Sequence, residues 1–133
     1  MRRGNDLRVT DFPFRFDDRY RKLLALGGVR PDRAVVKVGD ELLEARFGPW
    51  RCVSALDNVV GVEMSGPYSA VRAIGPRLSL KDRGLTFGTN TERGVCIRFA
   101  AAVPGLEPSG RLRHPGLTVT VADVDGLVAA LRR

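Results

Sequence analysis

Apolar and polar residues alternate through much of the first half of the chain. Alternate positions are apolar in residues 33–38 and again in residues 41–47, which is the period of a strand with one buried face. Gly39-Asp40 lies between these two segments and is a two-residue hairpin signal. We therefore expect an antiparallel hairpin. Its inward-facing residues should be Ala34, Val36, Val38, Leu43, Ala45 and Phe47.

The same period predicts further short strands. They are expected at residues 11–16, 50–54, 58–64, 77–80, 85–88, 94–99 and 117–121. Pro13 favours an edge position for the first of them, because proline cannot donate to a sheet ladder. Residues 81–84 and 89–93 are typical of turns. Residues 100–116, with three prolines and three glycines, are expected to form a loop.

Side-chain facing can be predicted for two of these strands, whereas one segment stays ambiguous. In the strand at 58–64 we expect one face to hold Val60, Val62 and Met64. In the strand at 94–99 the inward residues should be Val95, Ile97 and Phe99. Residues 68–76 fit either a short helix or an extended connector.

Two segments have the period of an amphipathic helix. Residues 17–26 can begin at Asp17 as N-cap, and Tyr20, Leu23 and Leu24 would form one apolar face. Gly27-Gly28 would end this helix. The second helix should begin at Asp123 and extend to residue 132. Its apolar stripe comprises Val124, Leu127, Val128 and Leu131.

Together these elements predict a mostly β protein of the α+β class. We expect seven or eight strands in a curled antiparallel sheet or barrel, with the C-terminal helix covering one open end and a short helix near the N-terminus. Residues 1–9 are expected to be a flexible arm, and residues 10–133 a single domain.

The chain is basic, with 22 Lys and Arg against 15 Asp and Glu, a formal charge of +7. Such a charge is typical of proteins that bind phosphate-bearing partners, but a biased composition explains it equally well. The charges alternate along the predicted strands, which favours the second explanation. No signal peptide and no apolar stretch of the ~20 residues needed for a transmembrane segment is visible. We expect a cytoplasmic protein whose two cysteines, Cys52 and Cys96, stay reduced.

Four motifs are distinctive. Residues 47–50 (FGPW), 75–79 (GPRLS), 82–90 (DRGLTFGTN) and 114–123 (HPGLTVTVAD) resemble a family of small, uncharacterised actinobacterial proteins over nearly the whole chain. The resemblance implies no particular function. The strand order with a terminal helix is also similar to the pleckstrin-homology-like (PH-like) barrel of bacterial proteins, although the helix at 17–26 departs from the simplest form of that fold.

Catalytic and metal-binding arrangements are not evident in the sequence. Cys52, Cys96 and His114 lack the spacing of zinc ligands, so we expect neither a metal nor another cofactor. The cysteines have no neighbouring base that would activate them. His114 is expected to shape the proline-flanked turn before the last strand. The acidic pairs at 17–18 and at 123 and 125 are explained as helix-start residues, and no phosphate-binding glycine motif is present.

A local excess of positive charge is the strongest indication of a binding site. Residues 64–113 contain eight basic and three acidic residues. The turns at 81–84 and 89–93 could bring several of these charges together, and arginine suits phosphate and carboxylate groups. The candidate ligand-binding residues are Trp50, Tyr68, Arg72, Arg77, Lys81, Arg83 and Arg93.

These residues lead us to expect a non-catalytic binding module for an anionic group or a protein segment. A nucleic-acid-binding protein is the first alternative, but aromatic residues make up only 7% and no recognition motif is visible. A small-ligand carrier or an enzyme with a pocket inside the barrel is the second alternative.

Overall fold

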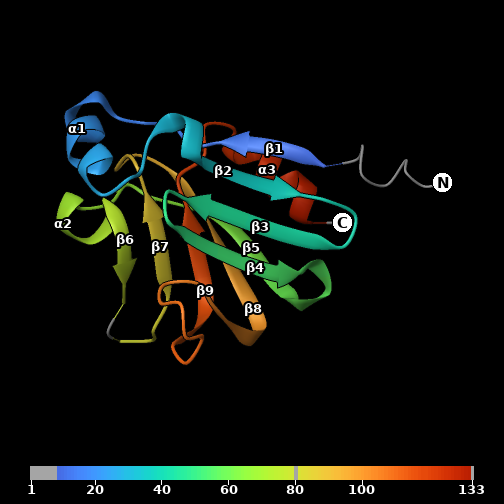
Figure 1. The fold of residues 1–133 in the computed structure, drawn as a ribbon. Coiled ribbons are helices and arrows are strands. Elements are labelled where there is room, and N and C mark those ends of the chain that lie inside the picture. The colour runs from blue at the N-terminus through green and yellow to red at the C-terminus, as the bar shows by residue number, and fades with distance from the viewer. Residues whose placement is uncertain (1–8, 80, 133) are drawn as a thin grey trace.

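The computed structural model describes residues 9–79 and 81–132, apart from the side chains of residues 71 and 72. In this part of the chain two β-sheets face each other, with helices at their ends (Figure 1). The elements in chain order are β1 (Thr10–Pro13), α1 (Asp18–Leu26), a 3₁₀ turn (Pro31–Arg33), β2 (Ala34–Val38), β3 (Leu42–Phe47), β4 (Trp50–Ala55), a second 3₁₀ turn (Leu56–Asn58), β5 (Val59–Ser65), α2 (Ala70–Ala73), β6 (Gly75–Leu78), β7 (Leu85–Gly88), β8 (Gly94–Pro104), β9 (Arg113–Val119) and α3 (Val124–Leu131).

The two sheets differ in how their strands are connected. The first has the order β1-β2-β3-β4, and every neighbouring pair in it is antiparallel. The second has the order β5-β8-β9-β7-β6, in which β7 and β9 are parallel and place Leu85 opposite Leu117. The other pairs of the second sheet are antiparallel. An isolated bridge between Phe14 and Val121 joins the end of β1 to the chain beyond β9.

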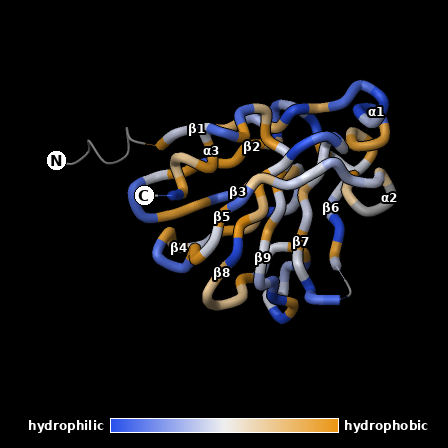
Figure 2. Tube along the Cα trace, turned by 180° about the vertical axis from the view of Figure 1, so that it is seen from behind, coloured by the Kyte–Doolittle hydropathy of each residue, from blue (hydrophilic) through white to orange (hydrophobic). Residues whose placement is uncertain are grey.

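One hydrophobic core lies between the sheets. Phe47 of β3 stacks on Phe87 of β7 across the interface, with ring centroids 4.8 Å apart and planes inclined by 4°. Phe14 packs against Phe47 at 5.3 Å. Helix α3 packs against β5 and β8 and adds its apolar stripe to this core. Figure 2 shows hydrophobic stretches along the strands of both sheets and a hydrophilic stretch at the β6–β7 turn.

The local predictions are largely confirmed. The hairpin of β2 and β3 has its six expected inward residues buried. Strand β1 is an edge strand, as Pro13 predicted. The expected caps also form: Asp17 accepts a hydrogen bond from the Arg19 amide at 3.0 Å, and Asp123 accepts one from the Gly126 amide at 2.9 Å. All four residues of the predicted C-terminal stripe are buried, and so are the three inward residues of β8.

The prediction of one curled antiparallel sheet or closed barrel is wrong. The described strands form two separate sheets, nine strands in place of seven or eight, and one pair is parallel. Each of the nine strands overlaps a segment that the alternation predicted, including the four-residue strands β6 and β7, which pair with each other over their whole length. The parallel pair arises because β9 inserts between β8 and β7 after a long excursion, which no local pattern reports. The arm prediction for residues 1–9 falls almost entirely outside the described residues.

The prediction of a loop over residues 100–116 is also wrong in part. Strand β8 continues to Pro104 and β9 begins at Arg113, so only residues 105–112 connect them. A register shift between Arg98 and Val103 bends this hairpin. The bend interrupts the alternation, which is why the period-two pattern ended at residue 99.

Two apolar faces are smaller than predicted. Leu23 of α1 is 62% exposed, so only Leu24 and Tyr20 of its expected face pack against the core. On β5, Val60 and Met64 are exposed and only Val62 packs against the core. A bulge between Val59 and Gly61 breaks the alternation there, and β5 is the outermost strand of its sheet. Residues 68–76 turn out to contain the short helix α2 followed by the start of β6.

Candidate functional site

The space between the two sheets is filled by side chains. Phe47, Phe87, Ile97, Leu117 and Leu127 are all fully buried there. The concave sites of interest lie on the surface. Two of them meet at Trp50, the only tryptophan of the chain.

The first concavity, named here the Arg77 pocket, lies between α1, the start of β4 and the start of β6. Its volume is about 270 Å³. Its floor consists of core residues, and among the described side chains Arg77 is the one charged residue in its lining. The lining residues are Leu23, Leu24, Gly27, Val29, Trp50, Ile74, Gly75, Pro76 and Arg77. The structure thus brings together two of the predicted candidates, Trp50 and Arg77.

The second concavity, named here the edge groove, runs between β4 and the loop that follows β8. Its volume is about 690 Å³. One side is formed by residues 49–51 and Val53, and the other by residues 104–108 and Gly110. Gly105 packs against Cys52 so closely that an added Cβ would lie 3.1 Å from the Cys52 Cβ. The loop therefore passes along the inner side of β4. The groove lies between this loop and the edge of β4.

The backbone of β4 is available along this groove. Among the described residues no strand pairs with β4 on the side away from β3. The Leu56 amide donates to the Glu41 carbonyl at 2.8 Å, so Glu41 and Leu56 form a hydrogen-bonded pair. The next pair along the two strands, Leu42 and Ala55, is therefore a non-hydrogen-bonded pair. Because bonded and non-bonded pairs alternate, the N–H and C=O groups of Arg51 and Val53 point into the groove.

The remaining basic candidates do not join Trp50 and Arg77. Lys81 and Arg83 are exposed in the turn before β7, whereas Arg93 lies in the turn after it. The two turns therefore sit at opposite ends of β7, as Figure 1 shows. Sequence proximity suggested that these charges could converge, but an extended strand separates its two ends by about 3.3 Å per residue. The side chain of Arg72, in α2, lies outside the described part of the chain.

Arg93 and Tyr68 are already engaged by neighbouring residues. The Arg93 guanidinium lies 3.7 Å from the Asp125 carboxylate and 3.3 Å from the Met64 sulfur. Tyr68 donates its amide to the Thr91 carbonyl at 2.8 Å, and its hydroxyl bonds to the Ser65 hydroxyl. Burial raises the pKa of Tyr68. These two residues belong to the packing around the 89–93 turn.

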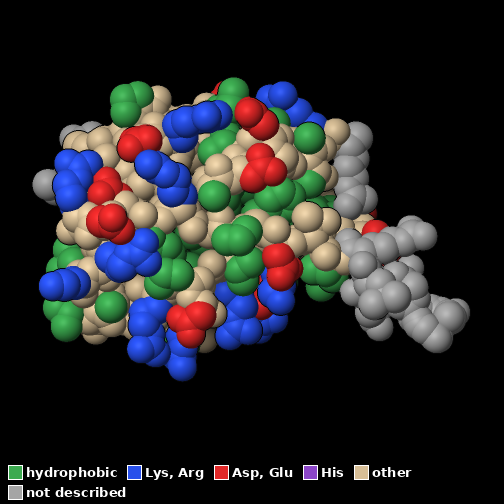
Figure 3. Space-filling view, turned by 90° about the horizontal axis from the view of Figure 1, so that it is seen from above, with side chains coloured by type: hydrophobic (Ala, Val, Ile, Leu, Met, Phe, Trp, Pro, Cys, Tyr) green, Lys and Arg blue, Asp and Glu red, His purple; other side chains and the backbone are tan. Residues whose placement is uncertain are grey.

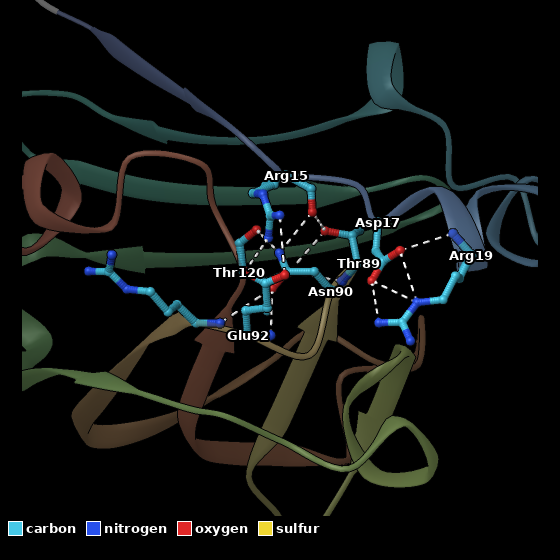
Figure 4. Close-up of polar contacts among 8 residues, drawn as sticks. Arg15, Asp17, Arg19, Thr89, Asn90, Glu92 and Thr120 are labelled. Carbon is cyan, nitrogen blue, oxygen red and sulfur yellow. Dashed lines mark hydrogen bonds and ion pairs between the residues drawn. The ribbon is translucent and has the colours of Figure 1, made fainter.

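A buried polar network holds that turn in place. Figure 4 shows Thr89, Asn90 and Thr120 directed toward one another and toward the carbonyl of Arg15. Thr89 and Asn90 donate to this carbonyl at 2.6 and 2.8 Å, and the Thr89 amide donates to the Thr120 hydroxyl at 2.8 Å. Each of these polar groups has its partner within the protein. The network therefore ties the ends of β1, β7 and β9 together.

The exposed charges nearby form local pairs. Arg15 pairs with Glu92 at 3.1 Å, and Arg19 pairs with Asp17 at 2.9 Å. The hydrogen bonds from Arg19 lower the pKa of the Asp17 carboxyl. Figure 3 shows that Lys, Arg, Asp and Glu side chains are interspersed on the face seen from above.

His114 has a different role from the one predicted. It lies within β9 and is fully buried, and its Nδ1 is 2.7 Å from the carbonyl oxygen of Arg83. A carbonyl can only accept, so Nδ1 carries the proton and donates. Nε2 is buried without a partner among the described residues. His114 thus anchors the β6–β7 turn, where Arg83 adopts a left-handed conformation at φ 64°, and does not shape a turn of its own.

The two cysteines are free and occupy different environments. Cys52 is 1% exposed, and burial raises the pKa of its thiol to about 12. Cys96 is half-buried on the outer face of its sheet, as its position opposite Val95 and Ile97 predicted. Within the described ranges no group of three or more His, Cys, Asp and Glu side chains could hold a metal ion.

Sequence reasoning missed several residues that line the two concavities. Arg51 and Val53 were predicted to lie in a strand, but nothing local indicated that this strand would end its sheet. The loop of residues 104–108 was noted only for its length and prolines. Leu23 was assigned to the buried face of α1, whereas the structure exposes it beside Trp50.

Comparisons with known proteins leave the geometry as the basis for a functional conclusion. None of the helices in the described part of the chain is both long and apolar enough to cross a membrane. No family model matches the chain, and searches of curated proteins and of solved structures found no match either.

Proposed function

We propose that this protein is a non-catalytic interaction module that binds an extended protein segment along the free edge of β4. The segment would add a strand to the first sheet and lie in the edge groove. The observation that carries this proposal is the orientation of the Arg51 and Val53 backbone groups, which point into a groove of about 690 Å³.

Strand addition draws its affinity from main-chain hydrogen bonds and its specificity from pockets for alternate side chains. Arg51 and Val53 offer two N–H donors and two C=O acceptors. At about 0.5–1.5 kcal/mol net for each bond, four bonds would contribute roughly 2–6 kcal/mol. Trp50 at one end of the groove and Leu106 and Pro108 opposite supply apolar surface for the side chains of the segment.

The other edge strands are less suited to a partner. Strand β5 is packed against α3, and its Val62 carbonyl accepts a hydrogen bond from Arg132 at 2.8 Å. Strand β1 is bridged to the second sheet through Phe14 and Val121. Strand β6 contains Pro76, which lacks an amide proton. The groove beside β4 combines an open ladder with an apolar wall, and its charged lining residues among those described are Arg51 and Glu107. Arg51 pairs with Glu44 at 2.6 Å, and the Glu107 carboxylate accepts hydrogen bonds from the Ser109 and Leu112 amides of its own loop. The groove therefore favours a largely uncharged segment.

The experiment uses Val53→Pro, with Val53→Thr as the matched control. Proline removes the outward N–H of residue 53 without removing a bond to β3, and edge strands tolerate proline at such positions. Threonine keeps the β-branched shape and the N–H. Peptides selected from a random linear library by the wild-type protein would be synthesised, and their binding followed through Trp50 fluorescence and by calorimetry.

We expect Val53→Pro to bind the selected peptides at least several-fold more weakly than the wild type, and Val53→Thr to bind them normally. Circular dichroism and urea unfolding of both variants test whether the fold is kept. Failure of the wild type to select any peptide, or equal binding by the two variants, would contradict the proposal.

Three further statements stay proposals of the same kind. The kinship with small actinobacterial proteins and the PH-like identity rest on the four motifs and on the strand order. A cytoplasmic location rests on the low cysteine content of the chain, two in 133 residues. The edge-groove proposal depends on none of them.

A further inference from the structure

The Arg77 pocket differs from the edge groove in its chemistry, although Trp50 lines both. Its floor is formed by Leu24, Val29 and Ile74, each at most 4% exposed, so the floor belongs to the core and is rigid. Leu23 and Trp50 form apolar walls. A volume of about 270 Å³ equals that of roughly nine water molecules at about 30 Å³ each, so the pocket suits a small ligand.

The guanidinium of Arg77 is oriented, and no described carboxylate pairs with it. Its Nε donates to the Ile74 carbonyl at 2.7 Å, which fixes the plane of the group at the pocket rim. No Asp or Glu in the described part of the chain forms an ion pair with it, whereas Arg15, Arg51 and Arg93 all have such partners. The two Nη atoms are therefore left to form a parallel pair of hydrogen bonds with a planar carboxylate.

An apolar cavity with an oriented guanidinium at its rim matches one class of ligand. We infer that the Arg77 pocket binds a small monocarboxylic acid with an apolar body, such as a medium-chain aliphatic acid. The apolar body lies against Leu24, Val29 and the indole of Trp50, and the carboxylate pairs with the two Nη atoms of Arg77. This site does not depend on strand addition at β4.

The test compares octanoate with octanamide, which has the same apolar body and no charge. Each compound is titrated into the full-length protein while Trp50 fluorescence and the indole N–H resonance are recorded. Octanoate is expected to bind saturably and more tightly than octanamide. Because charge-assisted hydrogen bonds contribute about 1.5–3 kcal/mol, Arg77→Gln should weaken octanoate binding about 10- to 100-fold. It should leave octanamide binding nearly unchanged.

Arg46→Gln is the control for net charge, because Arg46 is exposed on the outer face of the first sheet, away from the pocket. Leu23→Asp is a second variant that does not disturb the core, since Leu23 is 62% exposed, and it places a negative charge in the pocket wall. We expect Arg46→Gln to bind octanoate like the wild type and Leu23→Asp to lose octanoate binding.

Three results would overturn the inference: no saturable response to octanoate, octanamide binding as tightly as octanoate, or equal octanoate binding by Arg77→Gln and Arg46→Gln. The outcome is separable from that of the edge-groove experiment, because Val53 lies outside this pocket and Arg77 outside the groove. Val53→Pro is therefore expected to bind octanoate like the wild type.

Discussion

Thr120→Val is expected to destabilise the fold through a single buried backbone amide. The Thr89 amide has its hydrogen bond with the Thr120 hydroxyl at 2.8 Å, and both residues are fully buried. Valine has nearly the shape of threonine but cannot accept a hydrogen bond. The substitution therefore leaves the Thr89 N–H without a partner in a place that water does not reach.

The direction of the second bond in this pair follows from the network. Thr89 donates its hydroxyl proton to the Arg15 carbonyl at 2.6 Å, so in the 2.9 Å contact between the two hydroxyls Thr120 must be the donor. Thr120→Val removes this bond as well. An orphaned amide costs about 1–3 kcal/mol and the lost hydroxyl bond about 0.5–1.5 kcal/mol. We expect a total loss of roughly 2–4 kcal/mol in the free energy of unfolding.

Two further variants make the expectation specific. Thr89→Val should cost less, because the Thr89 amide keeps its bond to Thr120 and the Arg15 carbonyl keeps its bond from Asn90 at 2.8 Å. Only the Thr120 hydroxyl proton, which can rotate, loses its acceptor. Thr118→Val is the matched control, since Thr118 is a half-buried threonine on the outer face of β9. It should change the free energy of unfolding by no more than about 0.5 kcal/mol.

Urea unfolding followed by far-ultraviolet circular dichroism and Trp50 fluorescence measures these differences. With a slope of about 2 kcal/mol/M, the urea midpoint for Thr120→Val should fall by roughly 1–2 M at unchanged slope. Coincident transitions from the two probes test two-state behaviour. The reasoning is refuted if Thr120→Val is no more destabilised than Thr118→Val, or if Thr89→Val is the more damaging of the two buried changes.

Two further predictions concern titratable side chains. At neutral pH a thiol reagent should modify Cys96 rapidly and Cys52 only after unfolding in urea. The reason is that Cys52 is 1% exposed and burial raises the pKa of its thiol to about 12. Two rapidly reacting thiols in the native protein would contradict this burial. Hydrogen bonds from the Leu112 amide and from Ser109 lower the pKa of Glu107 from 4.5 to about 2. The stabilisation from Glu107 is therefore present above pH 4.5 and is lost as the pH falls toward about 2. Urea unfolding at a series of pH values should show that Glu107→Gln loses less stability than the wild type as the pH falls through this range. Equal losses in the two proteins would count against this prediction.

The sequence alone determined the elements whose signals are local. The β2–β3 hairpin follows from strict alternation on both sides of Gly39-Asp40. Helix α3 follows from a capping aspartate, Asp123, and an apolar stripe at helical spacing. Such patterns are decided by neighbours within a few residues, so the sequence displays both the element and the face that it buries.

The tertiary structure decided three other features. They are the split into two sheets, the parallel pairing of β7 with β9, and the continuation of β8 to Pro104. Each depends on which strand pairs with which over long sequence distances, and on a register shift in β8 that alternation cannot reveal. For the same reason local patterning could not show that β4 would end its sheet with open backbone groups.

The candidate site shows the same division. Trp50 and Arg77 could be selected as candidates from their residue types, because an indole and a guanidinium are suited to binding anywhere on a surface. Only the fold decided that these two residues meet in one pocket and that Leu23 is exposed beside them. The fold also separates Arg83 from Arg93 by the length of β7. Residue type is encoded locally, whereas proximity is set by the packing of elements that are distant in the chain.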